Sequence, residues 1–330
     1  MSESLPTTIA VDAVGGDFAP SEVLAGVRSA IADDPALTIL LVGPSDVVVP
    51  FASTAGERVS AVVASEIIAM DDHPASAVRS KKDSSIVVGC GLVRDGAAHG
   101  FFSAGSTGAM MAASTLVVGR IKGVSRPAIA TVLPTTGRPV VLLDVGANAD
   151  CKAEYLVQFA HMGAAYASTV LGCETPRIGL LNIGEEPTKG SALAVEAHGL
   201  MSAAVEGFVG NVEGRDLASG TVDVVVTDGF TGNVALKLLE GTSAFLLGQL
   251  KEAMTSSLPR KAAASVLRPA LREMRDRLDP DSYGGAPLLG VRGVCIIGHG
   301  SSSARAVSNA IRVAAQAARG GLTTRIEASL

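Results

Sequence analysis

Residues 101–114 have the sequence FFSAGSTGAMMAAS, in which an apolar run gives way to a turn of small residues before apolar residues return at helical spacing. Gly105 and Gly108 allow close backbone approach, and Ser106 and Thr107 supply hydroxyl groups where a helix would begin. The free N–H groups of a helix start favour an anion. The same turn is also an ordinary strand-to-helix connection. The stretch therefore predicts a strand, a turn and a helix, and leaves both interpretations of the turn open.

The same strand-and-turn pattern recurs along the chain. Aliphatic runs alternate with helical patterns: TTIAVDA (7–13), LTILLVG (37–43), GFFSAG (100–105), AIATVLP (128–134), PVVLLDVG (139–146), RIGLLNIG (177–184), VDVVVTDG (222–229) and GVCIIGHG (293–300). This alternation predicts an α/β fold with a mostly parallel sheet covered by helices on both faces. Most runs end in glycine beside a polar residue, and the carboxyl ends of parallel strands share one edge. We therefore expect six polar turns to converge there, near Asp12, Gly105, Asp144, Asn182, Asp228 and His299.

Composition excludes several classes of protein. The 330 residues are 48% hydrophobic and 18% charged, which is typical of a compact globular protein. A net charge of −5 and the absence of Trp argue against nucleic acid as a partner, because phosphate contacts need basic residues and base stacking needs aromatic ones. No linker or internal repeat interrupts the chain. We predict a single domain over residues 1–330 with an insert at about residues 245–285.

Cofactor and metal motifs fail when their order and spacing are checked. GEEPTKGS (184–191) has Lys-Gly-Ser where a phosphate-binding loop needs Gly-Lys-Ser. GHGSSSA (298–304) lies too close to the end of the sequence for a dinucleotide fold to follow it. The four cysteines are far apart and fit a reducing cytosol. We expect no cofactor and no metal, and the N-terminal residues and hydropathy predict a soluble protein without a leader or membrane span.

The insert contains a basic amphipathic segment, LPRKAAASVLRPALREMRDRL (258–278), in an otherwise acidic chain. Its apolar residues recur at helical spacing: Leu267, Leu271, Met274 and Leu278. A neighbouring stripe is basic: Arg268, Arg272 and Arg275. We expect Pro269 to mark the first turn of this helix. The helix could pack on its own domain, rest on an anionic membrane surface or bind an acidic protein.

Seven stretches together resemble one known family: IAVDAVGGDFAPSEVL, SAGSTGAMMAA, LLDVGANADCKAEYLVQFA, GLLNIGEEPTKGS, FVGNVEGRDL, VVVTDGFTGNVALK and GHGSSSARAVSNAI. They are similar to the bacterial phosphate acyltransferases, from about residue 8 to about residue 315. The resemblance implies a three-layer α/β/α fold of the isocitrate/isopropylmalate-dehydrogenase type, related to phosphotransacetylases. The sequence departs from the family at three positions. The family usually has Asn at position 106, where this chain has Ser106, so the role of that position is undefined. It often has Glu in place of Pro187 and Asn or a similar polar residue in place of Ser191.

The resemblance also implies the reaction and the partners. Inorganic phosphate attacks the thioester of a long-chain acyl carrier protein, and the acyl phosphate then feeds glycerol-3-phosphate acylation by a membrane enzyme in phospholipid synthesis. It implies a homodimer, and we expect a cytoplasmic location with peripheral contact to the inner face of the membrane. Two alternatives remain open: a phosphotransacetylase acting on coenzyme A thioesters, and a non-catalytic scaffold for carrier protein and membrane.

Within that resemblance the residues can be given roles. Phosphate is itself the nucleophile, so the protein must bind it and stabilise the developing oxyanion. We expect the catalytic groups to be Lys189, Asn233 and His299, with His299 as the acid for the departing thiolate. We expect substrate or phosphate binding by Gly105, Ser106, Thr107, Gly108, Asp12, Asn148, Glu185, Thr231, Gly232, Lys237, Gly300 and Ser301. We expect carrier-protein or membrane contact by Arg268, Leu271, Arg272 and Arg275.

Overall fold

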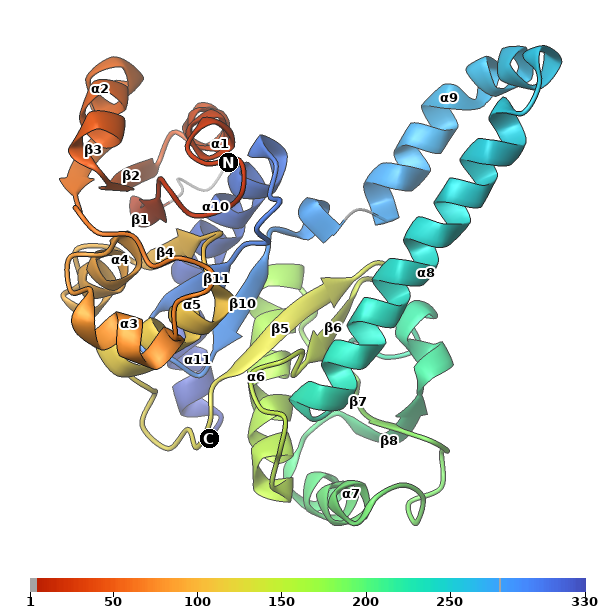
Figure 1. The fold of residues 1–330 in the computed structure, drawn as a ribbon. Coiled ribbons are helices and arrows are strands. Elements are labelled where there is room, and N and C mark those ends of the chain that lie inside the picture. Colours follow the sequence, from red (N-terminus) through yellow and green to blue (C-terminus); the bar gives the residue numbers. More distant parts are fainter. Residues whose placement is uncertain (1–4, 279) are drawn as a thin grey trace.

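The computed structural model describes residues 5–278 and 280–330 and contains one mixed sheet (Figure 1). Its strands are β1 (Thr7–Asp12), β2 (Leu37–Gly43), β3 (Val59–Val63), β4 (Gly100–Ser103), β5 (Ala128–Leu133), β6 (Val140–Leu143), β7 (Ile178–Asn182), β8 (Phe208–Glu213), β9 (Val224–Val226), β10 (Ala286–Leu289) and β11 (Val294–Ile297). Their order is β3-β2-β1-β4-β11-β10-β5-β6-β9-β7-β8. All eight apolar runs form strands. Three further strands, β3, β8 and β10, were not predicted from the sequence.

Helices cover both faces of this sheet. They are α1 (Ser21–Asp33), α2 (Ser45–Ala55), α3 (Pro74–Ser80), α4 (Ser85–Arg94), α5 (Thr107–Ala113), α6 (Ala153–Leu171), α7 (Ala192–Ala204), α8 (Gly229–Thr255), α9 (Leu258–Leu278), α10 (Ala304–Arg319) and α11 (Leu322–Ala328). One core cluster packs α1, α6 and α10 on the sheet, with Tyr166 fully buried. The other packs α4, α5 and α8 on the opposite face, with Met110 fully buried. Helices on both faces confirm the predicted three-layer α/β/α class.

The strand directions differ from the expected single parallel array. The short strand β10 runs antiparallel to both β11 and β5, and β5 runs antiparallel to β6. As a result β1, β4 and β11 end at one edge, whereas β6, β9 and β7 end at the opposite edge. The prediction that six strand-end turns converge on one edge is therefore wrong. Three of them, at Asp12, Gly105 and His299, lie on one side, and the other three lie on the other.

Helices α8 and α9 form a hairpin that projects from the sheet (Figure 1). Only Gly229 and Gly232 are buried among the described residues of α8, because most of the helix extends beyond the body of the fold. The predicted segment 258–278 is helical throughout, but the expectation for Pro269 is wrong, since it lies inside α9. The first turn instead contains Pro259, a position at which proline sacrifices no intrahelical hydrogen bond. Within the described ranges, no helix is long and apolar enough to cross a membrane.

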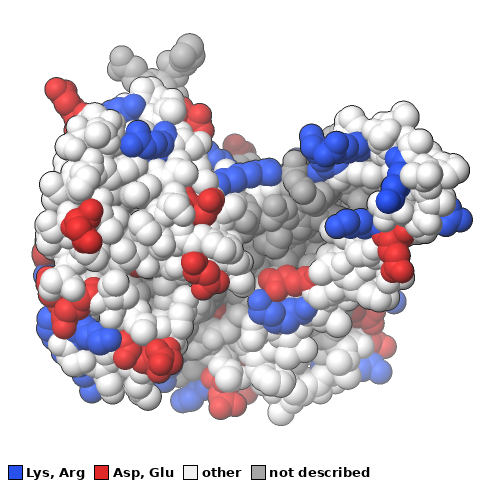
Figure 2. All heavy atoms as spheres, turned by 45° about the horizontal axis from the view of Figure 1, so that its top comes forward, with Lys and Arg blue, Asp and Glu red and all other residues white. Residues whose placement is uncertain are grey.

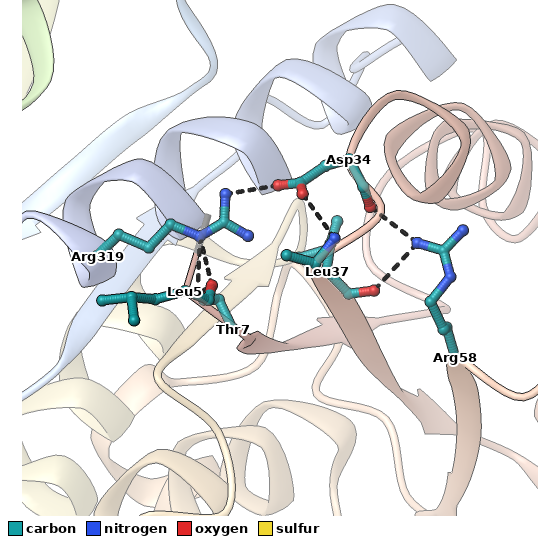
Figure 3. A network of polar contacts seen from close by, with 7 residues as sticks. Leu5, Thr7, Asp34, Leu37, Arg58 and Arg319 are labelled. Atoms are coloured by element: carbon teal, nitrogen blue, oxygen red, sulfur yellow. Dashed lines mark hydrogen bonds and ion pairs between the residues drawn. The ribbon is translucent and has the colours of Figure 1, made fainter. Parts of the chain in front are cut away.

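An arginine network joins the first strand to the last long helix (Figure 3). From α10, Arg319 donates through Nε to the carbonyl oxygen of Leu5 (3.0 Å) and to Oγ1 of Thr7 (2.9 Å), and through Nη1 to Asp34 (2.7 Å). Arg58 donates to the carbonyl oxygen of Asp34 at 2.8 Å. Burial raises the pKa of Asp34, but the hydrogen bond and charge of Arg319 more than offset this, so the pKa lies below its ordinary value. The network ties α10, which follows the His299 turn, to the β1–β2 region.

Candidate active site

The central cavity, of ≈ 390 Å³, is lined by residues of α5 and α8 and of strands β5, β10 and β11, among others. It brings together residues from distant parts of the chain. Six of the predicted site residues line it: Gly105, Thr107, Asn233, Lys237, His299 and Gly300. Residues from the two edges of the sheet meet here because α8 begins at the edge where β9 ends and runs back beside the sheet. The α8 side chains can then face the opposite turns.

The turn of residues 105–108 supplies one wall of the central cavity. Ser106 is the N-cap of α5, and its Oγ accepts a hydrogen bond from the N–H of Ala109 at 3.4 Å, as the helix-start interpretation requires. Ser106 is therefore buried and used locally, whereas Thr107 is exposed and lines the cavity. Gly108 packs against Pro74, where a Cβ would come within 2.6 Å of the ring. Gly105 and Thr107 are thus the members of this turn that reach the cavity.

Helix α8 supplies the opposite wall. Asn233, Leu236, Lys237 and Glu240 are spaced by three or four residues, so they share one helix face, and all four line the central cavity. Lys237 forms an ion pair with Glu240 at 2.8 Å. Asn233 is exposed, so its amide is accessible to a ligand. The cavity thus contains an amide donor and a cation that already has a carboxylate partner.

Thr231 and Gly232 serve the start of α8 rather than the cavity. The N–H and hydroxyl of Thr231 both donate to the capping carboxylate of Asp228, at 2.8 and 2.7 Å. A side chain at Gly232 would collide with the carbonyl oxygen of Asp144. Neither residue lines the central cavity, so the structure does not bring these two predicted binding residues to it.

Asp144 anchors the loop beneath α8. Its Oδ1 accepts from the N–H groups of Ile129, Gly146 and Ala147 at 3.0 to 3.2 Å. Its Oδ2 accepts from the N–H and Nδ2 of Asn148 at 2.7 and 2.9 Å. Burial raises the pKa of Asp144 above its ordinary value, and these hydrogen bonds oppose the rise. The amide of Asn148 also donates to a backbone carbonyl, so this predicted binding residue is occupied structurally.

Asp12 is similarly occupied at the end of β1. It is almost fully buried, and its carboxylate accepts from Oγ of Ser103 at 2.6 Å and from the N–H of Val14 at 3.1 Å. Burial raises its pKa despite these hydrogen bonds. Glu185 lies elsewhere, exposed and 3.7 Å from Arg215. The structure therefore places both predicted binding carboxylates away from the central cavity.

His299 is held in one orientation by Ser301. Its Nδ1 lies 2.7 Å from Oγ of Ser301 and accepts from the backbone N–H of Ser301 at 3.3 Å. Because a backbone N–H can only donate, Nδ1 is an acceptor, and the neutral ring carries its proton on Nε2. Ser301 does not line the cavity but fixes the tautomer of a residue that does. The ring can thus donate a hydrogen bond from Nε2.

Lys189 stands apart from Asn233 and His299. It lies in the β7–α7 loop, where Asn182 donates to its carbonyl oxygen at 2.9 Å. Asn211 on β8 donates to the carbonyl oxygen of Glu186, which also accepts the N–H of Lys189. A second cavity of ≈ 270 Å³, lined by Asn182, Gly190, Ser191, Asp228 and Thr231 among others, adjoins this loop. Asn211 was not among the predicted site residues, although it lies in the family-like stretch FVGNVEGRDL.

Caps decide which helix starts can attract an anion. The N-terminus of α10 already contacts a carboxylate, because Glu22 accepts from the N–H of Ala304 at 2.6 Å, and α8 has its Asp228 cap. In contrast, α5 and α7 are capped by the neutral hydroxyls of Ser106 and Ser191. Of these four helices, α5, at the central cavity, and α7, beside Lys189, therefore begin with a neutral cap that does not compete with phosphate.

In the part of the chain that the structure describes, no group of three or more His, Cys, Asp or Glu side chains is arranged to hold a metal ion. Burial raises the pKa of Cys151 to about 11, so this thiol stays protonated and is a weak nucleophile at neutral pH.

Most of the predicted contact residues on the hairpin are accessible. Arg268 and Arg272 are exposed on α9, and Leu271 is half-buried. Arg275 belongs to α9, but its side chain lies outside the described residues. Figure 2 shows Lys and Arg side chains gathered on the projecting hairpin.

Known proteins resemble this chain over nearly its whole length. Residues 7–325 match the family model described as "Fatty acid synthesis protein". A phosphate acyltransferase from Heliobacterium modesticaldum is 53% identical over 312 residues, which cover 93% of each chain. One from Desulfitobacterium hafniense is 49% identical over 326 residues, covering 98% of this chain and 97% of the other.

Solved structures at low identity support the fold. The EutD phosphotransacetylase from Staphylococcus aureus matches with a TM-score of 0.64 and 16% identity, covering 96% of this chain and 95% of that one. A 4-hydroxythreonine-4-phosphate dehydrogenase from Burkholderia phymatum matches with a TM-score of 0.52 and 13% identity, covering 96% and 99%. These likenesses show that phosphotransacetylases and a dehydrogenase share the architecture.

Proposed function

The chain belongs to the fatty acid synthesis protein family and is a phosphate acyltransferase of lipid synthesis, and from that premise we propose that it moves a long-chain acyl group from acyl carrier protein to inorganic phosphate. The observation that carries this proposal is the central cavity, which sets Asn233 and His299 opposite the neutrally capped start of α5. That arrangement offers hydrogen-bond donors to two anions, the phosphate and the developing oxyanion.

The proposed reaction uses phosphate as the nucleophile. Phosphate binds at the start of α5, and one of its oxygens forms a bond to the thioester carbonyl carbon. The amide of Asn233 donates to the oxyanion that develops there. The carbon–sulfur bond then breaks, giving acyl phosphate and the carrier thiolate, which takes its proton from solvent.

His299 and Lys189 have separate roles in this proposal. His299 donates from Nε2 to the departing sulfur, since Nδ1 accepts the N–H of Ser301. Lys189 is exposed, and no ion pair to it occurs within the described residues, so its ammonium is available to negative charge. We propose that it acts from the neighbouring cavity.

The reaction can be tested with purified protein, palmitoyl carrier protein and phosphate, with hydroxylamine trapping acyl phosphate as hydroxamate. We expect hydroxamate to form only when phosphate is present. Product from acetyl coenzyme A but not from palmitoyl carrier protein would replace the proposal with a phosphotransacetylase, the alternative that the fold likeness favours. Equal product without phosphate would show direct attack by hydroxylamine and would contradict phosphate transfer.

We further propose that the catalytic unit is a homodimer built through α8. Phe230, Val234, Leu238 and Phe245 are 66%, 52%, 68% and 64% exposed. Their spacing places them along one side of the helix, away from the face that lines the cavity. A second copy of the chain would cover this apolar stripe, since exposed contiguous apolar surface marks interfaces.

The end of the hairpin fits both proposed partners. Leu258 and Val266, in the first half of α9, are 82% and 79% exposed, and the basic residues Arg268 and Arg272 are exposed farther along the same helix. Basic and apolar groups together suit the anionic inner face of a membrane, and the basic groups alone suit acidic carrier protein. We propose a cytoplasmic protein that touches the membrane peripherally, where a membrane-bound glycerol-3-phosphate acyltransferase consumes its product.

Two pairs of substitutions separate these contacts. Leu258→Glu with Val266→Glu should reduce flotation with phosphatidylglycerol vesicles about tenfold or more, because apolar insertion is lost. Arg268→Glu with Arg272→Glu should weaken carrier-protein binding at low salt and flatten its salt dependence. Val49→Glu, at an exposed apolar position on α2, is the control. Unchanged flotation in the first pair would remove the membrane contact.

A further inference from the structure

We propose that the inner part of the central cavity holds the acyl chain of the thioester, an inference that rests on the proposed function. The cavity changes character with depth. At its mouth Thr107, Asn233 and His299 are polar and exposed. Its buried lining is mostly apolar: Phe102, Ile129, Ile297, Ala306 and Ala310 are at most 5% exposed, and Ser302, at 7%, is a polar member. A site that is polar outside and apolar inside matches a ligand with a reacting head and an apolar tail.

Small residues create the space for such a tail. Ala306 and Ala310 lie one turn apart on α10, so both methyl groups border the cavity. Ala306 is buried yet belongs to neither core cluster, so its methyl faces the cavity rather than packed neighbours. Gly285 has φ +79°, and a Cβ there would come within 2.9 Å of the carbonyl oxygen of Ile297. The backbone therefore keeps this part of the wall without a side chain.

The position of the donors sets the direction of the chain. A thioester carbonyl at Asn233, with its sulfur near His299, leaves the carrier protein outside and directs the acyl group toward Ile129 and Ala306. Each methylene that moves from water into such surroundings favours binding about fourfold. The inner lining would therefore select long chains over short ones, while the polar mouth is common to all thioesters.

Filling the cavity tests this assignment. Ala306→Leu should lower kcat/KM for palmitoyl carrier protein about tenfold, as the added side chain displaces roughly two methylenes. For butyryl carrier protein, kcat/KM should stay within about twofold. Ala318→Leu lies on the same helix, half-buried but outside the cavity, and is the matched control with an unchanged chain-length ratio. Ala310→Val repeats the test if Ala306→Leu does not fold.

Binding measurements separate failure of this inference from failure of the proposed function. Calorimetry should show that the native chain binds dodecylphosphonate, below its micelle concentration, more tightly than butylphosphonate, and that Ala306→Leu loses this preference. This readout holds even if no thioester yields acyl phosphate. An equal fall for both acyl lengths would mean that the cavity holds a part common to all thioesters. Unchanged kinetics and binding in Ala306→Leu would place the chain elsewhere; either result overturns the assignment.

Discussion

Replacing Asn233 by aspartate is expected to lower phosphate-dependent acyl transfer about a thousandfold while leaving the fold intact. The substitution removes an amide donor, and loss of one oxyanion donor alone costs about a hundredfold to a thousandfold. It also places a negative charge where the phosphate dianion must enter. Asn233 is exposed, so the free energy of unfolding should change by no more than about 0.5 kcal/mol. Hydroxamate formation and urea unfolding measure the two effects.

Lys189→Ala in the same assay shows where the chemistry takes place. Asn233 lines the central cavity, whereas Lys189 precedes Gly190 and Ser191, which line the second cavity. If Asn233→Asp retains more than a tenth of the activity while Lys189→Ala loses nearly all of it, the reaction belongs to the cavity beside α7. A large loss in both would mean that the substrate spans the two cavities. Full activity in both would remove the proposed oxyanion and charge contacts.

The local sequence predicted most of this fold because most of its strands have a distinct apolar pattern. Apolar runs that end at glycine, such as residues 139–146, need no distant information to be recognised. By contrast, β10 is the four-residue stretch APLL, which has no distinctive period. Its antiparallel pairing with both β11 and β5 is a long-range property, and it leaves β5 running in the same direction as β11. The expected meeting of six turns failed because β6, which follows β5 after the short connection of residues 134–139, runs antiparallel to β5, and β9 and β7 follow the direction of β6.

The candidate site was predictable in part, for a different physical reason. Thr107, Asn233 and His299 follow strand ends and do reach the central cavity. Asn148 and Thr231 follow strand ends too, but their polar groups bond to nearby backbone and carboxylates. Such local hydrogen bonds compete with ligand binding and depend on turn geometry. The residue type at a strand end therefore does not distinguish a side chain that contacts a ligand from one whose hydrogen bonds are all made within its own turn.

Asp144→Ala should be the most damaging single substitution for stability, because this buried carboxylate orders the loop that packs against the start of α8. The change removes the hydrogen-bond acceptor of several backbone N–H groups, including those of Ile129, Ala147 and Asn148. Each unsatisfied buried donor costs about 1–3 kcal/mol. The variant no longer buries a charge, and the desolvation penalty that it avoids offsets part of this loss of stability. We expect a net loss of about 4 kcal/mol in the free energy of unfolding by urea.

Asp228→Ala provides the matched control for this prediction, since it removes a carboxylate from the same helix start. Asp228 is only half-buried and caps one turn, so its loss should cost about 1 kcal/mol. Asp144→Ala should also lower acyl transfer at temperatures where the variant stays folded, because the loop that it orders meets Gly232, one residue before Asn233. Equal destabilisation by the two substitutions would contradict the anchoring role of Asp144. The position of Asn233 would then depend on the packing of α8 against the sheet alone.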